Sequence, residues 1–273
     1  MPIISIFSGG FCQEDTVIEE VVARTGYGQI TDDEIVAEAS RRSTLAESKI
    51  KRAFSSKTSV FNKFTFEKER SLAYIKLAVA DLIATDNALI TNFSGQLIPA
   101  TISHTLRVCL IAPQKYRTAA AAEQRGISEK DAAKLVQRRE EDCAFWVDTL
   151  FSNSDPWNPA LYDIVIPVDK MSPQDAAALI VDNAGKDIIQ PTADSKQALE
   201  DFRLAAEALH VDLQSPCQPN IVQNCRAQVK RHRADLFECL INKMVDRSEF
   251  SLHSGIGDGR LPAQEIEVQS DRG

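Results

Sequence analysis

The chain has 273 residues, of which 44% are hydrophobic and 26% charged, and its 31 basic and 39 acidic side chains give a net charge of −8. This composition excludes a disordered chain, and the acidic balance argues against general nucleic-acid binding, because that binding depends on Lys and Arg neutralising phosphates. No apolar run approaches the roughly 20 residues of a membrane helix, and residues 2–7 lack the basic start and the length of a signal peptide. We therefore expect a cytoplasmic protein that binds no membrane.

Strand and helix patterns alternate from the start of the chain. Residues 2–7 form a short apolar run that stops at a Ser-Gly-Gly sequence, which is typical of a buried strand of a parallel sheet. Apolar residues at helical spacing follow Asp15, and Gly26 is placed to cap that helix at its end. Thr31 has Glu34 three positions on, the spacing of a capping box that begins a second helix.

The next elements follow from the same patterns. In chain order we expect a helix and a mobile loop in 44–64, a helix over 66–84, strands over 88–91 and 106–112, helices over 114–125 and 128–150, a strand over 162–166 and a helix over 172–181. Strands that alternate with helices in this way predict βαβ units, and so an α/β fold with a doubly wound parallel sheet.

The composition changes after the last of these helices. Residues 184–195 combine Asn, Gly, Lys, Asp, Pro and Thr and are typical of a linker, and two further helices are expected beyond it, near 196–210 and 220–246. The predicted domains are therefore a main domain 1–183, a linker 184–195, a helical C-terminal extension 196–250 and a flexible tail 251–273.

Cysteine and histidine patterns give no metal site. The six cysteines are scattered without a C-x-x-C pair, and the four histidines show no ligand spacing relative to them. In a cytosolic chain of this length we expect free, buried thiols. No metal is assigned.

A succession of motifs resembles a known family. The motifs are the glycine-bearing loop after the first strand, Gly26-Tyr27, the Thr-Asp-Asp-Glu-Ile of 31–35, the strand and proline of 106–113, the segment 126–132 and the Asp-Pro-Trp-Asn-Pro of 155–159. Over residues 2–183 the chain thereby resembles the cytidylate-kinase-like family of P-loop nucleoside monophosphate kinases. The resemblance implies a phosphate-cradling loop between a strand and a helix, a nucleoside monophosphate site and a lid that carries arginines. The arginines at or near the lid positions are Arg117, Arg125, Arg138 and Arg139.

The phosphate cradle is where this chain departs from the family. The glycine-rich turn of the family falls on residues 11–15, where Phe, Cys and Gln disfavour the positive φ angles that such anion nests use. Glu14 falls at or beside the position of the phosphate-clamping lysine. Two unit charges about 4 Å apart interact by roughly 4 kcal/mol at an effective dielectric near 20, so a carboxylate in place of an ammonium group opposes triphosphate binding. Glu14 and Asp15 instead suit the first turn of a helix, where they satisfy its dipole.

A second departure follows the strand at 88–91, where the family tends to place Gly-Arg and this chain has Asn92-Phe93. The glycine-bearing loop and the lid arginines each leave two interpretations open. Ser8, Gly9 and Gly10, with help from Thr16, form either a shifted anion nest or only a tight turn. The lid arginines are either ligands of an anion or part of a solvated helix face beside the acidic run 140–142.

Three functions are compatible with these residues, and whether the chain is an enzyme is left open. The first is a non-catalytic nucleotide-sensing, scaffold or oligomerising protein with a degenerate phosphate-binding loop. The alternative is an active ATP-dependent kinase of CMP, dCMP or another small acceptor, in which ATP and Mg²⁺ bind and the lid arginines stabilise the transferred phosphoryl group. The third is a module that binds a protein partner, or a second copy, through residues 184–273.

Overall fold

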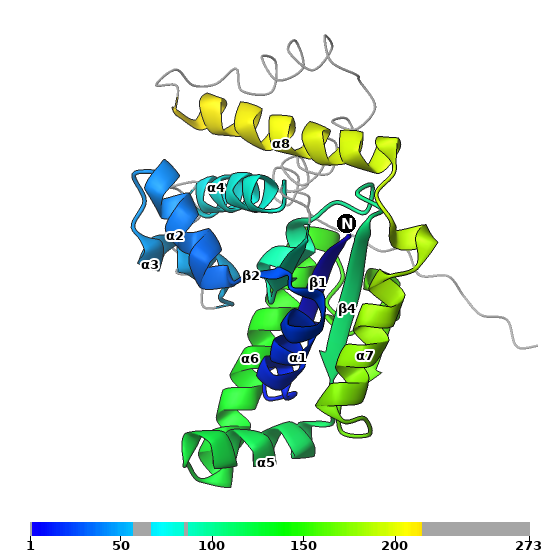
Figure 1. Cartoon of the computed structure of the whole chain (residues 1–273). Helices are drawn as coiled ribbons and strands as arrows, with labels where there is room; N and C mark the ends of the chain where they lie inside the picture. Colours follow the sequence, from blue (N-terminus) through cyan, green and yellow to red (C-terminus); the bar gives the residue numbers. More distant parts are fainter. Residues whose placement is uncertain (1, 57–66, 85–86, 215–273) are drawn as a thin grey trace, which may run out of the picture. The chain divides into compact units, whose positions relative to one another are not determined.

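The structure is a computed structural model (Figure 1) that describes residues 2–56, 67–84 and 87–214. Among the sequence predictions, the helix at 220–246, the tail at 251–273 and most of the loop that ends at residue 64 lie outside the described residues. No helix of the described part is both long and apolar enough to cross a membrane.

A five-stranded, all-parallel sheet lies at the centre of the fold, in the order β2-β3-β1-β4-β5. The strands are β1 (Ile3–Ser8), β2 (Gly28–Ile30), β3 (Ala88–Thr91), β4 (Thr105–Ile111) and β5 (Ile164–Pro167). The connection from β1 leads to β2 on one side of β1, whereas the connection from β3 leads to β4 on the other side of β1. The predicted doubly wound α/β sheet is thereby confirmed. In such sheets ligands bind at the carboxyl ends of the strands where the connections diverge, here β1 and β3.

Helices cover both faces of the sheet. They are α1 (Glu14–Thr25), α2 (Asp32–Arg42), α3 (Glu47–Lys51), α4 (Glu67–Leu82), α5 (Gln114–Arg125), α6 (Glu129–Phe151), α7 (Pro173–Ala184) and α8 (Ala193–Gln214). Short 3₁₀ turns lie at Arg52–Phe54, Ser94–Leu97, Pro159–Leu161 and Asp187–Ile189.

The alternation of side chains along β1 divides the core in two. Ile3 and Phe7 belong to the cluster that packs under α2, α4 and α6, whereas Ile4 and Ile6 belong to the cluster under α1 and α7. All four side chains are fully or almost fully buried, as expected for a central strand with a helix layer on each face.

Local sequence signals set the helix ends as predicted. Gly26 ends α1 in the left-handed conformation with φ 69°. The capping box at the start of α2 is complete, since Thr31 accepts a bond from the backbone of Glu34 and the carboxylate of Glu34 accepts one from the backbone of Thr31. Strand β2 (Gly28–Ile30) was not predicted from the sequence.

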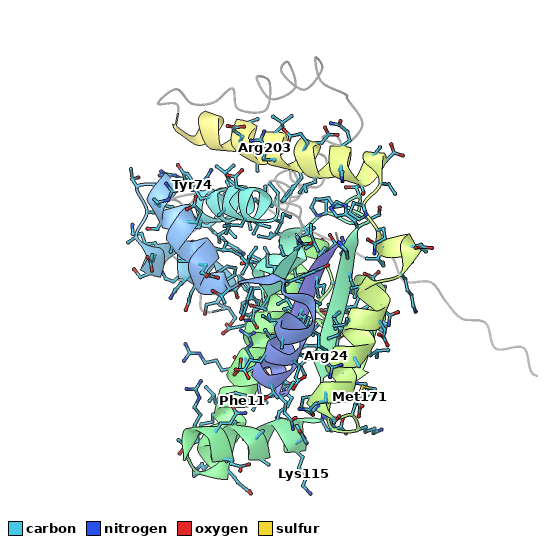
Figure 2. The ribbon with its side chains drawn as sticks, viewed as in Figure 1. Phe11, Arg24, Tyr74, Lys115, Met171 and Arg203 are labelled. Atoms are coloured by element: carbon cyan, nitrogen blue, oxygen red, sulfur yellow. The ribbon has the colours of Figure 1, made fainter. Side chains whose placement is uncertain are left out.

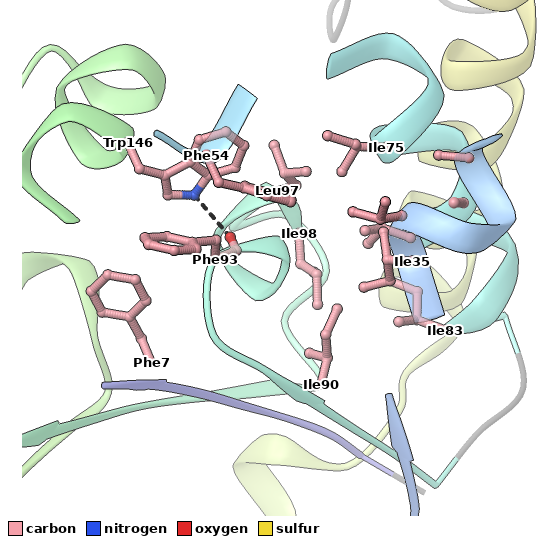
Figure 3. Close-up of a cluster of buried hydrophobic side chains, with 14 of the residues drawn as sticks. Phe7, Ile35, Phe54, Ile75, Ile83, Ile90, Phe93, Leu97, Ile98 and Trp146 are labelled. Atoms are coloured by element: carbon pink, nitrogen blue, oxygen red, sulfur yellow. Dashed lines mark hydrogen bonds between the residues drawn. The ribbon is translucent and has the colours of Figure 1, made fainter. Parts of the chain in front are cut away.

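Aromatic rings fill the layer between the sheet and α6 (Figure 3). The rings of Phe54 and Phe93 stack with centroids 5.5 Å apart, and Trp146 meets Phe54 edge-on at 4.9 Å. The indole Nε1 of Trp146 donates to the carbonyl oxygen of Phe93 at 2.8 Å. Trp146 is therefore part of the core.

Helix α8 packs on α4, where Ala206 meets Leu77 and Ala80, and Leu199 joins the main core. It belongs to the same compact unit as the sheet. The helix begins at Ala193, inside the predicted linker 184–195. The predicted domain boundaries are not tested by this contact and stay a prediction.

Candidate functional site

In the loop between β1 and α1, the backbone N–H groups of residues 9–12 all donate hydrogen bonds within the protein. The amide of Gly9 donates to the carbonyl of Leu110 at 3.5 Å, and that of Gly10 to the hydroxyl of Ser8 at 3.0 Å. The amide of Phe11 donates to Oε1 of Glu14 at 3.1 Å and that of Cys12 to Oε2 at 2.7 Å. All four N–H groups thus have acceptors within the protein.

Glu14 occupies the position that an anion would take in a backbone nest. It is the first residue of α1, and its carboxylate turns back to bind the two preceding loop amides. Carboxylate acceptors make hydrogen bonds about twice as strong as neutral ones. The sequence predicts that Glu14 satisfies the helix N-terminus. It does not predict that loop amides bind both carboxylate oxygens.

The loop backbone is strained at two non-glycine residues. Phe11 has φ 59° and Gln13 has φ 53°, next to Gly10 with φ 78°. The expectation that bulky residues would avoid positive φ in this turn is therefore wrong for Phe11 and Gln13. The left-handed conformation costs such residues roughly 1–3 kcal/mol each, so contacts of their side chains have to hold them there.

Gly9 and Gly10 accommodate side chains of the protein. A Cβ on Gly9 would lie 3.0 Å from Cη2 of Trp157 and 3.1 Å from Cζ of Arg117. A Cβ on Gly10 would lie 3.1 Å from Cγ of Arg139. The missing side chains thus make room for two arginines and a tryptophan.

Arg117 is the arginine most closely tied to the loop. Its Nη2 donates to the carbonyl of Gly9 at 2.7 Å and its Nε to that of Gly10 at 3.1 Å, while Nη1 forms an ion pair with Glu140 at 2.7 Å. The side chain is only 3% exposed. The guanidinium group therefore has three acceptors and little access to solvent.

A second pair of backbone amides, after β3, also donates to a carboxylate of the protein. The amides of Phe93 and Ser94 donate to the two carboxylate oxygens of Asp32 at 3.2 and 2.9 Å. Burial raises the pKa of the Asp32 carboxyl, against the opposing effect of hydrogen bonds from Ser94 and Phe93 and of the charge on Arg139. Sequence reasoning missed this role of Asp32, and its position at the start of α2 gave no signal for it.

Arg139 lies between the two loops. Its Nη2 donates to Oδ1 of Asn92 at 3.1 Å, and its guanidinium carbon lies 4.2 Å from the centre of the Phe93 ring. Cation–π contacts of this kind contribute about 0.5–2 kcal/mol. The Asn92-Phe93 sequence, noted as a departure from the family, is thus the partner of an arginine from α6.

The structure separates the remaining candidate residues from this cluster. Thr16 is exposed on α1, and Arg125 and Arg138 are exposed on the α5–α6 hairpin. The contacts that bring Arg117 and Arg139 to the loop involve neither Arg125 nor Arg138.

Three cysteines of the described residues are free and buried: Cys12 in this loop, Cys109 on β4 and Cys143 on α6. Burial raises the pKa of the Cys12 and Cys143 thiols to about 11 and that of Cys109 to about 12, so all three stay protonated at neutral pH. Among the described residues there is no cluster of Cys, His, Asp and Glu that could hold a metal ion.

Comparison with known proteins places this arrangement in a family. The model of the cytidylate kinase-like family matches residues 3–170, and the chain belongs to that family. Its fold is the doubly wound parallel sheet of the P-loop nucleoside monophosphate kinases, with a helical C-terminal region. No curated protein matches the chain.

Two solved structures are similar to this chain. An uncharacterized protein from Eubacterium ventriosum has a TM-score of 0.51 at 12% identity, over 67% of this chain and 98% of that chain. A shikimate kinase from Acinetobacter baumannii, in complex with shikimate, has a TM-score of 0.38 at 14% identity, over 68% of this chain and 96% of that chain. At such low identity the first of these likenesses shows the fold alone.

Proposed function

We propose that this chain is a non-catalytic member of the cytidylate kinase-like family, a cytoplasmic scaffold protein whose β1–α1 loop binds its own Glu14 in place of a nucleotide triphosphate. The observation that carries the proposal is the pair of hydrogen bonds from Phe11 and Cys12 to the Glu14 carboxylate. Together with the bonds of Gly9 and Gly10, they leave none of these four consecutive N–H groups free to donate to a phosphate.

The hydrogen bonds to Glu14 lower the affinity of the loop for any competing anion. Hydrogen bonds to a charged acceptor contribute about 1.5–3 kcal/mol each. A phosphate could bind only after the two bonds to Glu14 were broken, which would cost roughly 3–6 kcal/mol of binding free energy, a factor of about 10² to 10⁴ in affinity. The displaced carboxylate would also remain close to the phosphate and repel it.

The charges around the loop give no net attraction for a triphosphate. Arg117 is paired with Glu140, and Arg139 lies in the field of the buried Asp32. With Glu14, three carboxylates face two guanidinium groups. Phosphoryl transfer depends on cations that neutralise the transferred group, and the loop residues 9–15 contain no lysine. The residues present therefore do not fit ATP and Mg²⁺, and we derive no catalytic step through them.

The alternative, an active ATP-dependent kinase of CMP, dCMP or a similar acceptor, would need Arg117 and Arg139 to leave these partners. A nucleotide-sensing role would need the same release of the loop. We therefore favour the scaffold. That it acts on a protein partner or a second copy through residues 184–273, all of which lie beyond the family match, stays a prediction.

Isothermal titration of the full chain with ATP and Mg²⁺ tests the proposal. We expect no binding at sub-millimolar concentrations for the wild type. The Glu14→Ala variant, which frees the amides of Phe11 and Cys12, should bind ATP at least about tenfold more tightly than the wild type. Glu19→Ala, an exposed acid on the same helix, is the matched control and should behave as wild type.

Micromolar binding of ATP by the wild type would contradict the proposal. So would ADP release by the wild type in a coupled assay over a panel of nucleoside monophosphates. If Glu14→Ala binds no better than the wild type, Glu14 is not what excludes the nucleotide, and the proposal loses its main support.

A further inference from the structure

The same loop has a second set of contacts, which tie it to the hairpin formed by α5 and α6. Figure 1 shows this hairpin next to the end of β4, and Figure 2 places Phe11 beside it. The hairpin has a small core of its own, made by Ala121, Ala132 and Val136. The ring of Phe11 packs against that core, although Phe11 belongs to the loop after β1.

Polar contacts link the loop to α5. The side-chain amide of Gln13 donates to the hydroxyl of Tyr116. Arg117, one residue further along α5, donates to the carbonyls of Gly9 and Gly10 at 2.7 and 3.1 Å. These contacts involve both the strained residue Gln13 and the glycines that precede the strained Phe11.

Helix α6 is held to the same loop. The aliphatic part of Arg139 lies over Gly10, where a Cβ would be 3.1 Å away. Arg117 also joins the two helices through its 2.7 Å ion pair with Glu140. Both helices of the hairpin thus contact the loop and each other through buried or half-buried side chains.

The strain in the loop agrees with this set of contacts. Phe11 and Gln13 have φ 59° and 53°, and these are the two residues whose side chains reach the hairpin. Strain of roughly 1–3 kcal/mol per residue persists only where the surrounding contacts outweigh it. Gly in these positions would relieve the strain but would remove the ring of Phe11 and the side-chain amide of Gln13, which contact the hairpin.

We propose that the β1–α1 loop is a clasp that holds the α5–α6 hairpin in a fixed position with no ligand bound, through Phe11 in the hairpin core and through the bonds of Gln13 and Arg117. The clasp goes beyond the scaffold role and does not depend on it, because its contacts form within the chain alone.

Hydrogen exchange followed by mass spectrometry, on the full chain without nucleotide, tests the clasp. In the wild type we expect the amides of residues 114–140 to be protected. In Phe11→Asn, which keeps a left-handed conformation accessible but removes the ring, exchange in 114–140 should rise at least about tenfold while β1, β3 and β4 stay protected. Tyr116→Phe, which removes only the acceptor of the Gln13 bond, should give a smaller rise in the same segment.

The pattern of exchange separates a clasp from a general packing role. Phe151→Asn changes an exposed phenylalanine at the far end of α6 and should leave the exchange of 114–140 unchanged. If exchange in Phe11→Asn rises equally in the sheet and the hairpin, Phe11 supports global stability and the clasp is contradicted. Rapid exchange of 114–140 in the wild type would also overturn it. Neither result bears on ATP binding, so failure of the clasp and failure of the scaffold role are distinguishable.

Discussion

At the scale of single residues, the glycines after β1 serve the packing of the protein itself. Gly9 faces Trp157 and Arg117, two side chains that come from distant parts of the chain. In a phosphate-binding loop a glycine makes room for a ligand, and its replacement affects the ligand more than the fold. Here the neighbours of Gly9 are part of the fold, so its replacement should be felt as a loss of stability.

Gly9→Ala should therefore destabilise the protein by about 1–3 kcal/mol, the range for overpacking a filled site. Urea denaturation followed by circular dichroism measures the change. Gly28→Ala is the control, because a Cβ there would meet no atom within 4 Å, and its effect should stay within about 0.5 kcal/mol. Equal effects of the two substitutions would show that Gly9 is not closely packed.

The sequence predicts that the acids at the start of α1 satisfy the N-terminus of that helix, an effect of neighbours one turn away. In the structure the N-cap of α1 has no side-chain bond, and the Glu14 carboxylate binds the amides of Phe11 and Cys12 before the helix. The return of the Glu14 carboxylate to Phe11 and Cys12 depends on a strained turn that α5 and α6 stabilise. Nothing within the loop sequence specifies that turn.

At the scale of elements, local capping signals located most of the helices. Thr31 begins α2 through both bonds of a capping box, at 3.3 Å from the Glu34 amide to the Thr31 hydroxyl and at 2.8 Å from the Thr31 amide to the Glu34 carboxylate. These signals are reliable because all partners lie within four residues. Helix α2 also carries Asp32 to the second amide pair, so its start position matters for the site.

Thr31→Ala should lower the free energy of unfolding by about 1 kcal/mol through the loss of this cap. Thermal and urea unfolding of the variant measure the change. Thr16→Ala, at an exposed position in the first turn of α1, should change stability by less than about 0.5 kcal/mol. A cost for Thr31→Ala no larger than that of Thr16→Ala would mean that the cap contributes nothing.

Strand β2 was missed for an identifiable reason. It has three residues, two of them exposed, and it pairs only with β3 at the edge of the sheet. Such a segment has neither the apolar run nor the alternation that identifies a strand, and its conformation comes from the partner strand. The longer strands β1 and β4 were found within one or two residues because they are buried runs.

At the scale of the whole molecule, α8 extends the fold beyond the residues matched by the family. Leu199 is buried in the core cluster, whereas Leu204 on the same helix is 43% exposed. The helix lies against α4, which in turn contacts α2 and the 3₁₀ turn at Ser94–Leu97. If α8 unfolds together with the sheet, a substitution that leaves a cavity between α8 and the core should lower the free energy of unfolding of both.

Leu199→Ala should therefore shift the cooperative unfolding transition that tryptophan fluorescence reports, by about 2 kcal/mol. The two tryptophans, Trp146 and Trp157, lie against the sheet rather than on α8, so their signal reports the main domain. Leu204→Ala should leave the transition within about 0.5 kcal/mol of the wild type. An unchanged tryptophan transition in Leu199→Ala would instead mean that α8 unfolds separately, as expected for an extension that starts at residue 196.

By itself the sequence determined most of the strands and helices in their order and the α/β class, because these depend on periodicity and on neighbours a few positions apart. The resemblance to the cytidylate-kinase-like family rested on a succession of motifs over residues 2–183. Only the tertiary structure decided what fills the site. Arg117 reaches the carbonyl of Gly9 across 108 positions of the chain, and Arg139 reaches Asn92 across 47. Local patterns carry no information about such pairs, which form when parallel strands bring their carboxyl ends to one edge of the sheet.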